Sequence, residues 1–276
     1  MKRRLLNLSD VYGLIGKKLL HSFSPKIHSL LLKEMDLEGR YNLYEIEEEK
    51  LEESFLNLKN IGVKGLNVTI PYKVKIINYL DKLSDEAVKI GAVNTIQFLN
   101  GKALGYNTDY FGFKLTIEKY GVRVKNTRAL ILGTGGAARV VYHYLVDSGV
   151  SEVAFCSRDI KNVKMDSDKK IISYGDIKYE NNFDLLINCT PCGMYPDTGV
   201  SPIAEEEIEK FSTIIDLIYN PKETLLIKYG KERGLKTING LYMLVAQAYA
   251  SQCIWNLREI TVNDIIIDNI VAIMTN

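Results

Sequence analysis

The chain has 276 residues, of which 46% are apolar, and it carries 35 basic and 34 acidic side chains for a net charge of +1. This length suffices for two domains with packed cores. A net charge near zero gives no electrostatic reason to expect nucleic acid or a membrane as partner, and so favours a small molecule. No stretch approaches the roughly 20 apolar residues of a spanning helix, and the first apolar run is too short for a signal peptide. A cytoplasmic location is therefore expected.

Four cysteines occur, and two of them form the run Cys189-Thr190-Pro191-Cys192. A zinc site would need two further ligands, and the chain has no second cysteine pair. A redox pair of this spacing should open a helix, whereas Gly193 and Pro196 predict a loop here. The sequence therefore predicts reduced, partly apolar thiols and no metal.

The first hundred residues predict alternating strands and helices. Ser24-Pro25 favours a helix start, with Ser24 as the N-cap and Pro25 as the first helical residue. Pro71 should stop a strand and start another helix, and Ser84-Asp85-Glu86 should begin a short one with acid in its first turn. The expected strands span 11–16, 41–46 and 65–70, and the expected helices follow residues 24, 49, 71 and 84.

The clearest local signal is the pair Asn100-Gly101 between two alternating runs, which is typical of a type I′ hairpin. The flanking strands are expected at 95–99 and 102–106. Pairing across this turn sets Asn94 opposite Asn107, so Asn94 and Asp109 should lie at the same open end of the hairpin. That geometry predicts a single polar site.

From about residue 128 the pattern becomes continuous apolar strands separated by helices, as in a doubly wound parallel sheet. Strands are expected at 128–132, 152–156, 183–188, 213–217 and 235–238. The lysine-rich segment 159–180 should hold a short or irregular helix. Two helices, 240–256 and 261–275 with Thr261 as a cap, should return to brace the first domain.

Gly133-Thr134-Gly135-Gly136-Ala137-Ala138 follows a strand and opens a helix. The first glycine permits the tight turn, the second admits a pyrophosphate, and the helix N-terminus faces the phosphates. A glycine turn without a ligand is the alternative. Ser157-Arg158-Asp159 ends the next strand, where the adenosine ribose is read. Arg158 favours binding of the 2′-phosphate of NADP, whereas Asp159 is compatible with NAD. The alternative is a solvated Arg–Asp pair that does not bind the cofactor.

Lys73 lies beside Asn67 and Thr69, and Asp109 can supply a carboxylate. A lysine paired with a carboxylate can relay a proton to a hydroxyl or carbonyl, although an exposed lysine is the plain alternative.

Further polar candidates surround this pair. Ser22 and Ser24 can direct two hydroxyls to a carboxylate at a helix start. His21 and His28 are expected to be packed or exposed rather than catalytic. Gln247, in an apolar helix, needs a partner that is either a substrate hydroxyl or a backbone group. Tyr219 follows a strand end, where ligands bind in such sheets.

Seven ordered motifs, which run from Gly13 to Trp255, make the sequence similar to the shikimate dehydrogenase family. They include Ser22-Phe23-Ser24-Pro25, Asn67 to Lys73, Gly91 to Thr95, Gly105 to Asp109, the glycine turn, Tyr219-Asn220-Pro221, and Gly240 to Gln247. The resemblance implies NADP-linked reduction of 3-dehydroshikimate to shikimate in aromatic amino-acid biosynthesis. It also implies an N-terminal α/β substrate domain that faces a Rossmann domain across a cleft.

By the same resemblance, Lys73 is the acid/base, paired with Asp109. Ser22 and Ser24 hold the substrate carboxylate, while Asn67 supports the site. The ring hydroxyls are held by Thr69, Asn94, Asp109, Tyr219 and Gln247. The cofactor residues are Asp85, Gly133, Thr134, Gly135, Gly136, Ala137, Ser157, Arg158, Asp159, Thr190, Leu217 and Gly240. The expected domains are 1–108 with 241–276, and 109–240, in a monomer or homodimer.

Two departures from the family pattern concern the cofactor. Its Asn-Arg-Thr becomes Ser157-Arg158-Asp159, with Asn162 where a second basic residue is expected, and its Thr-Ser-Ala-Gly-Met loop becomes Thr190 to Met194. Two alternatives follow: a quinate/shikimate dehydrogenase that also uses NAD, and a non-catalytic dinucleotide-sensing protein of the same fold.

Overall fold

The computed structural model describes residues 10–20, 22–161, 163, 169–180 and 183–275. The chain forms two compact units. Unit 1 runs to Thr108 and is completed by Ala248–Met274, and unit 2 is Asp109–Gln247. The boundary therefore falls inside two helices, α4 (Thr108–Lys119) and α7 (Leu241–Trp255), and the latter is followed by α8 (Asp264–Thr275).

Unit 1 contains a mixed sheet in the strand order β2-β1-β3-β5-β6-β4. Its strands are β1 (Asp10–Gly16), β2 (Gly39–Glu45), β3 (Gly65–Val68), β4 (Lys82–Leu83), β5 (Thr95–Leu99) and β6 (Lys102–Tyr106). Its helices are α1 (Ser24–Glu34), α2 (Leu51–Asn60) and α3 (Asp85–Ile90), with short 3-10 turns η1 (Glu48–Lys50) and η2 (Lys75–Tyr79). Apolar side chains of β1, β3, β5 and α2 form its principal core.

The β5–β6 hairpin has the predicted register, with Thr95 opposite Tyr106. Both turn residues, Asn100 and Gly101, have positive φ angles of 50° and 76°, as a type I′ turn requires. The hairpin prediction is confirmed. The short helix predicted from Ser84-Asp85-Glu86 is also confirmed as α3, and Ser84 caps it because its Oγ accepts a hydrogen bond from Ala87 N.

Three predicted helix starts are wrong. Ser24 is the first residue of α1 and Phe23 is its cap residue, without a side-chain cap bond. Asn263, not Thr261, caps α8, where its Oδ1 accepts from Ile266 N. The segment after Pro71 forms the 3-10 helix η2 instead of an α-helix, and the Lys73 carbonyl accepts from Val93 N at 2.7 Å.

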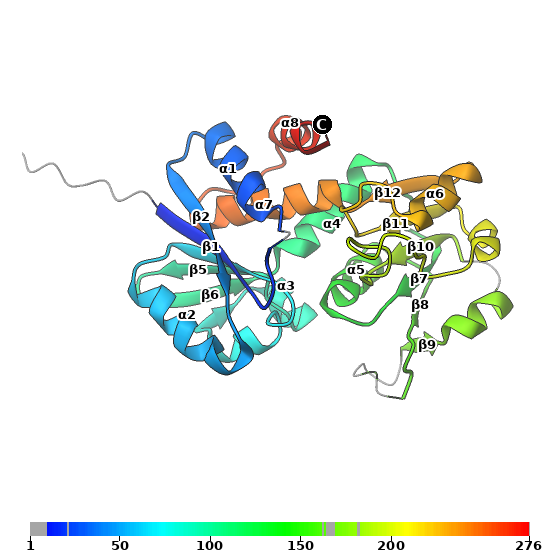
Figure 1. Cartoon of the computed structure of the whole chain (residues 1–276), viewed down its shortest axis with the longest axis horizontal. Coiled ribbons are helices and arrows are strands. Elements are labelled where there is room, and N and C mark those ends of the chain that lie inside the picture. The colour runs from blue at the N-terminus through cyan, green and yellow to red at the C-terminus, as the bar shows by residue number, and fades with distance from the viewer. Residues whose placement is uncertain (1–9, 21, 162, 164–168, 181–182, 276) are drawn as a thin grey trace, which may run out of the picture. The chain divides into compact units, whose positions relative to one another are not determined.

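Unit 2 contains a parallel sheet in the order β12-β11-β10-β7-β8-β9 (Figure 1). Its strands are β7 (Arg128–Leu132), β8 (Glu152–Cys156), β9 (Lys170–Ile172), β10 (Leu185–Asn188), β11 (Thr213–Asp216) and β12 (Lys236–Asn239). Its further helices are α5 (Gly136–Asp147) and α6 (Leu225–Glu232), with 3-10 turns η3 (Tyr174–Tyr179) and η4 (Glu205–Lys210). Two apolar clusters cover opposite faces, as predicted: Ala129 and Ile131 join one, Leu130 and Leu132 the other.

The segment after β8 differs from the prediction of a short helix, since it contains β9 and η3. The strand forms because Ile171 and Ile172 pair with Phe155 and Cys156 of β8. Only three residues make the strand, too few for a periodicity argument. No helix in the described part of the chain is long and apolar enough to cross a membrane.

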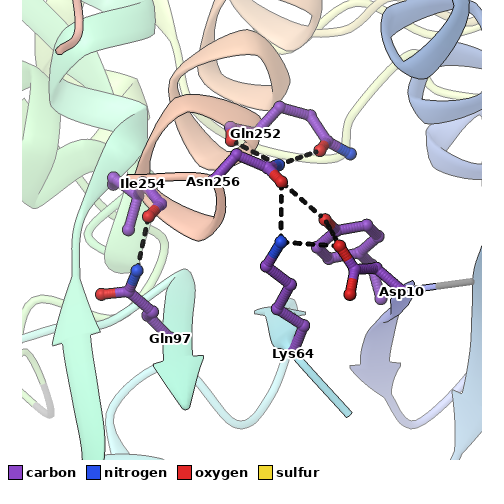
Figure 2. A network of polar contacts seen from close by, with 7 residues as sticks. Asp10, Lys64, Gln97, Gln252, Ile254 and Asn256 are labelled. Carbon is purple, nitrogen blue, oxygen red and sulfur yellow. Dashed lines mark hydrogen bonds and ion pairs between the residues drawn. The ribbon is translucent and has the colours of Figure 1, made fainter. Parts of the chain in front are cut away.

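A polar cluster ties the end of α7 to the first sheet of unit 1 (Figure 2). Lys64 Nζ donates to Asp10 Oδ2 at 2.6 Å and to Asn256 Oδ1 at 2.8 Å. Asn256 Nδ2 donates in turn to the carbonyl of Gln252, and Gln97 Nε2 donates to the carbonyl of Ile254. These bonds fix the α7 register, on which the position of every inward-facing α7 side chain depends.

Gly65 provides the first test of this packing. A Cβ at Gly65 would lie 2.2 Å from Cδ1 of Trp255, and the indole cannot move away freely because its Nε1 donates to the Ile96 carbonyl. We expect Gly65→Ala to destabilise the protein by about 1–3 kcal/mol, the usual cost of overpacking. Urea unfolding of both forms measures this. Gly199→Ala, where a Cβ meets nothing within 4 Å, is the control, and equal stability losses in both variants would contradict the packing argument.

Candidate active site

A buried hydrogen-bond network in unit 1 joins β3, the β5–β6 hairpin and α7. Asn67 Nδ2 donates to the Asn94 carbonyl at 3.2 Å, to Thr95 Oγ1 at 3.0 Å and to Ser251 Oγ at 3.0 Å. Asn67 Oδ1 accepts from the Tyr41 hydroxyl at 2.8 Å. Every polar atom of the Asn67 amide is thus used inside the protein. Asn67 acts as a fixed brace for the side chains around it.

The network also fixes how Asn94 is turned. Its Oδ1 accepts from Thr108 N at 2.7 Å, and the hydroxyls of Thr95 and Thr108 lie 3.0 and 3.2 Å away. A backbone N–H can only donate, so a flipped amide would set donor against donor. The oxygen of Asn94 is therefore committed to the protein. Its NH₂ is the group that Asn94 can offer to a ligand oxygen.

Lys73 lies in a turn that is anchored at both ends. Thr69 N donates to the Ile15 carbonyl at 2.9 Å, and the Lys73 carbonyl accepts from Val93 N at 2.7 Å. Val68 N donates to the Asn94 carbonyl at 2.8 Å. The turn that carries Thr69 and Lys73 is thus bound to the segment that carries Asn94. Both side chains are partly exposed, as a group that meets a ligand must be.

The serine pair lies at the start of α1. Ser22 Oγ accepts from Ser24 N at 3.2 Å, and both residues are partly exposed. Burial raises the pKa of Tyr41 well above its ordinary value, and a hydrogen bond with Ser24 opposes this effect. Tyr41 therefore joins Ser24 to Asn67. The two serines are thus linked to the Asn67–Asn94 network, whose two asparagines are buried.

His28 is fully buried beside this network, which is the packed alternative of the prediction that it is packed or exposed. It stacks on Tyr41 with ring centroids 4.0 Å apart, and its Nδ1 lies 3.0 Å from Gln252 Nε2. Burial lowers the pKa of His28 to about 3. The ring is neutral at ordinary pH and serves as packing. His21 lies outside the described residues.

Unit 2 contributes a second set of predicted substrate residues. Asp109 is in the first turn of α4, and a Cβ at Gly112, three residues on, would lie 3.1 Å from Gln247 Cβ. The helices that carry Asp109 and Gln247 are thus in contact. Gln247 Nε2 donates to the Leu244 carbonyl at 2.8 Å. One of the two amide hydrogens of Gln247 thus has a backbone partner, which was one of the two predicted alternatives. Lys73 belongs to unit 1 and Asp109 to unit 2, so their pairing stays a prediction.

The glycine turn of unit 2 has the geometry of a phosphate cradle. Gly133 has φ +96°, and its N–H donates to the Cys156 carbonyl at 2.9 Å, which bends the chain sharply after β7. A Cβ at Gly135 would meet no atom within 4 Å, so the backbone there is open to a ligand. The turn ends at the N-terminus of α5, which favours an anion. These features fit a pyrophosphate.

The loop after β8 follows at the next strand. Ser157 Oγ accepts from Asp159 N at 3.2 Å, and Arg158 and Asp159 are both exposed. Burial raises the pKa of Tyr174 to about 12, and the Arg158 charge acts against this effect. The guanidinium therefore lies in the neighbourhood of η3. An exposed cation at this strand end suits a 2′-phosphate.

On the other side of β7, a buried network joins the ends of β10 and β11. Asn188 Oδ1 accepts from Thr190 N at 3.0 Å and from Thr190 Oγ1 at 2.7 Å, and its Nδ2 donates to Asp216 Oδ1 at 3.0 Å. Asp216 also accepts from Ile218 N at 3.1 Å and from the Thr224 hydroxyl at 2.6 Å. Thr190 Cγ2 would lie 3.0 Å from a Cβ at Gly133. The network thus extends to the glycine turn.

Leu217 and Gly240 approach each other at the same edge. A Cβ at Gly240 would lie 2.0 Å from the Leu217 carbonyl oxygen, so only glycine fits. Tyr219 follows β11 and is partly exposed, and burial raises the pKa of its phenol. Asp85, an exposed residue in the first turn of α3, belongs to unit 1.

Sequence reasoning missed the polar residues that support both sites. In unit 1 these are Tyr41, Thr95, Thr108 and Ser251, and in unit 2 they are Asn188, Asp216 and Thr224. Asp216 had the strongest signal, since a carboxylate that ends a continuous apolar strand must be satisfied by hydrogen bonds. All four cysteines are free thiols. The described residues contain no His, Cys, Asp and Glu cluster able to hold a metal ion.

A parallel sheet with a glycine turn at its carboxyl edge, a cation at the next strand end and a separate polar unit defines a dinucleotide-dependent oxidoreductase of the doubly wound class. Residues 14–96 match the family model described as the shikimate dehydrogenase substrate binding domain. The NADP(+) shikimate dehydrogenase of Clostridium beijerinckii is 46% identical over 89% of this chain and 92% of that relative. This chain belongs to the shikimate dehydrogenase family.

Solved structures agree with this assignment. A chorismate mutase/shikimate 5-dehydrogenase fusion protein from Clostridium acetobutylicum is 46% identical and superposes with a TM-score of 0.92 over 97% of both chains. The shikimate 5-dehydrogenase of Thermus thermophilus, solved in complex with NADP(H) and shikimate, is 28% identical. It superposes with a TM-score of 0.84 over 95% of this chain and 98% of that one.

Ser251 tests whether the buried network acts through Asn94. Ser251→Ala removes a hydroxyl that lies 2.9 Å from Thr95 Oγ1 and 3.2 Å from Thr108 Oγ1, the two hydroxyls beside Asn94 Oδ1. We expect the KM for shikimate to rise about two- to tenfold, the value of one ordinary hydrogen bond, with the KM for NADP unchanged. Initial rates measure both constants.

A double-mutant cycle with Asn94→Ala separates positioning from general damage. If Ser251 acts through Asn94, its effect on the KM disappears in the Asn94→Ala background. Thr116→Val, which removes a buried hydroxyl that bonds only to Gly112 O among the contacts described, is the control for lost stability alone. Additive effects of the two substitutions would contradict the positioning account.

Proposed function

We propose that this chain catalyses the reversible NADP-linked reduction of 3-dehydroshikimate to shikimate, in the biosynthesis of aromatic amino acids. The observation that carries the proposal is identity of 46% over 89% of the chain to a relative with that name. It is supported by a phosphate cradle and an exposed Arg158 in unit 2, and by the Asn67–Asn94 network in unit 1.

The substrate is a small polar ring with one carboxylate. Different predicted residues are proposed to bind the carboxylate and the ring oxygens. The hydroxyls of Ser22 and Ser24, at the start of α1, are proposed to hold the carboxylate. Asn94 offers its NH₂ to a ring oxygen because its own oxygen accepts from Thr108 N. Thr69 and, from unit 2, Asp109, Tyr219 and Gln247 are proposed to complete the hydrogen bonds to the ring.

Lys73 is proposed as the acid/base of the reaction. When bound, the reduced nicotinamide supplies a hydride to the carbonyl carbon. The carbonyl oxygen gains negative charge as this happens, and the Lys73 ammonium donates a proton to it. In the oxidative direction the Lys73 amine takes the hydroxyl proton, and Asp109 is proposed as its partner.

NADP is the cofactor that Arg158 favours, because a 2′-phosphate accepts charge-assisted hydrogen bonds from a guanidinium. Asp159, exposed beside Arg158, favours the alternative of a quinate/shikimate dehydrogenase that also uses NAD. Activity with a substrate would exclude the second alternative, a non-catalytic dinucleotide-sensing protein. The monomer or homodimer and the cytoplasmic location expected from the sequence stay predictions.

Lys73→Ala tests the proposed chemistry. Loss of general acid–base catalysis should lower kcat about 10²- to 10⁴-fold, with the affinity for NADP close to wild type. Steady-state rates and a fluorescence titration with NADPH measure the two effects. Lys75→Ala, which removes an exposed lysine that pairs with Glu48, is the matched control. Turnover of Lys73→Ala near that of the control would exclude Lys73 as the acid/base.

Arg158→Ala tests the cofactor assignment. It should raise the KM for NADP and spare the KM for NAD, since only NADP carries the phosphate that the guanidinium binds. Asp159→Thr should improve the KM for NADP by removing a nearby negative charge. Arg123→Ala, a change of another exposed arginine of unit 2, is the control. If Arg158→Ala weakens both cofactors equally, Arg158 does not read the phosphate.

A further inference from the structure

Asp216 is a buried carboxylate to which neither the fold nor the proposed chemistry assigns a role. Its side chain has no exposed surface, and it forms no ion pair with any described residue. It is satisfied instead by three neutral donors: Asn188 Nδ2 at 3.0 Å, Ile218 N at 3.1 Å and the Thr224 hydroxyl at 2.6 Å. A buried charge without a cation is costly, so the position invites a functional explanation.

The order of the strands locates Asp216 relative to a bound dinucleotide. The sheet runs β11-β10-β7-β8, with the glycine turn after β7 and Arg158 after β8. A dinucleotide with its pyrophosphate at the turn and its adenosine phosphate at Arg158 must extend its other half over the ends of β10 and β11. Asp216 is the last residue of β11. The nicotinamide half of a bound dinucleotide would therefore lie at the strand end that contains this carboxylate.

We propose that Asp216 is an electrostatic positioning residue that biases the cofactor site toward the oxidised, positively charged nicotinamide. This inference rests on the proposed NADP-linked function. An ionised Asp216 attracts the positive ring of NADP⁺ and has no such attraction for the neutral ring of NADPH. A cation at position 216 would instead disfavour the positive ring of NADP⁺. If Asp216 served only to hold the surrounding hydrogen bonds in place, it would have no effect on the relative affinities for NADP⁺ and NADPH.

The surroundings of Asp216 decide when it is charged. Burial raises the pKa of Asp216 to about 6, and its three hydrogen bonds oppose this effect. The titratable groups coupled to it are the thiols of Cys189 on the β10 side and Cys192 in the following loop, whose pKa values are raised by burial and then by Asp216. Both thiols are neutral between pH 5 and 8. Asp216 is thus the group whose charge changes in this cluster.

Asp216→Asn tests the proposal with little change of shape. Its amide oxygen can still accept from Asn188 and Ile218, and its NH₂ can donate to Thr224 once that hydroxyl turns. We expect the ratio of the Kd for NADP⁺ to the Kd for NADPH, measured at pH 8 by fluorescence and calorimetry, to rise about three- to tenfold. That range corresponds to charges within about 10 Å in a medium of intermediate dielectric.

Two controls make the result specific. Asp184→Asn is the same change at the amino end of β10, where Asp184 Oδ2 accepts from Arg128 N, and it should leave the ratio unchanged. Thr224→Val damages the same cluster and the α6 cap but keeps the charge. It should lower the Tm with the ratio near wild type.

The wild-type protein gives a test that does not depend on folding of a variant. The folded-state pKa of Asp216 lies above its ordinary value, so the group takes up a proton as the pH falls through about 6. The Kd ratio should therefore rise toward the Asp216→Asn value between pH 8 and pH 5. The cofactor's own phosphate titrates equally in both forms and cancels in the ratio.

The outcomes separate the two proposals. If wild type binds neither NADP⁺ nor NADPH, the proposed function fails. If both bind and Asp216→Asn changes their Kd values by the same factor, or the wild-type ratio is constant with pH, the electrostatic role of Asp216 is overturned while the function stands.

Discussion

The hydrogen bond from Thr108 N to Asn94 Oδ1 sets the chemistry of unit 1. It joins the end of the β5–β6 hairpin to the first residue of α4, and it decides which face of the Asn94 amide is committed to the protein. Buried polar atoms need hydrogen-bond partners, and around this bond the side chains of Asn67, Thr95 and Ser251 are hydrogen-bonded to one another. The result is a buried network in which the protein itself fixes the orientation of the Asn94 amide.

Unit 2 also has a buried hydrogen-bond network, and this network contains the carboxylate of Asp216. The glycine turn, Thr190, Asn188 and Asp216 form a row along the carboxyl ends of three neighbouring strands. In open parallel sheets, ligands bind outside the carboxyl ends of the strands. Hydrogen bonds rather than apolar packing hold this row together. In each unit, buried hydrogen bonds thus orient polar side chains near the predicted site residues.

Much of this was predictable from the sequence. Asn100-Gly101 specified the hairpin, and the apolar runs specified five of the six strands of the parallel sheet. Strand β9 was missed because its three residues form through pairing with β8. After Pro71 the chain forms the 3-10 helix η2 rather than an α-helix, and Val93 N binds the Lys73 carbonyl, a long-range contact that the local sequence does not contain. The role of Ser251 could not be predicted, since it depends on the register of a helix 184 residues from Asn67.

The predicted site residues divide between the two units, with Lys73 and Asn94 in one and Asp109 in the other. The proposed function requires these residues to hold shikimate and move its proton while a hydride passes between shikimate and NADP. Initial rates of the purified protein with shikimate and with quinate, each with NADP and with NAD, test it most directly. The account predicts the highest kcat/KM for shikimate with NADP. Dinucleotide binding without turnover of either substrate would contradict it and support a sensing protein.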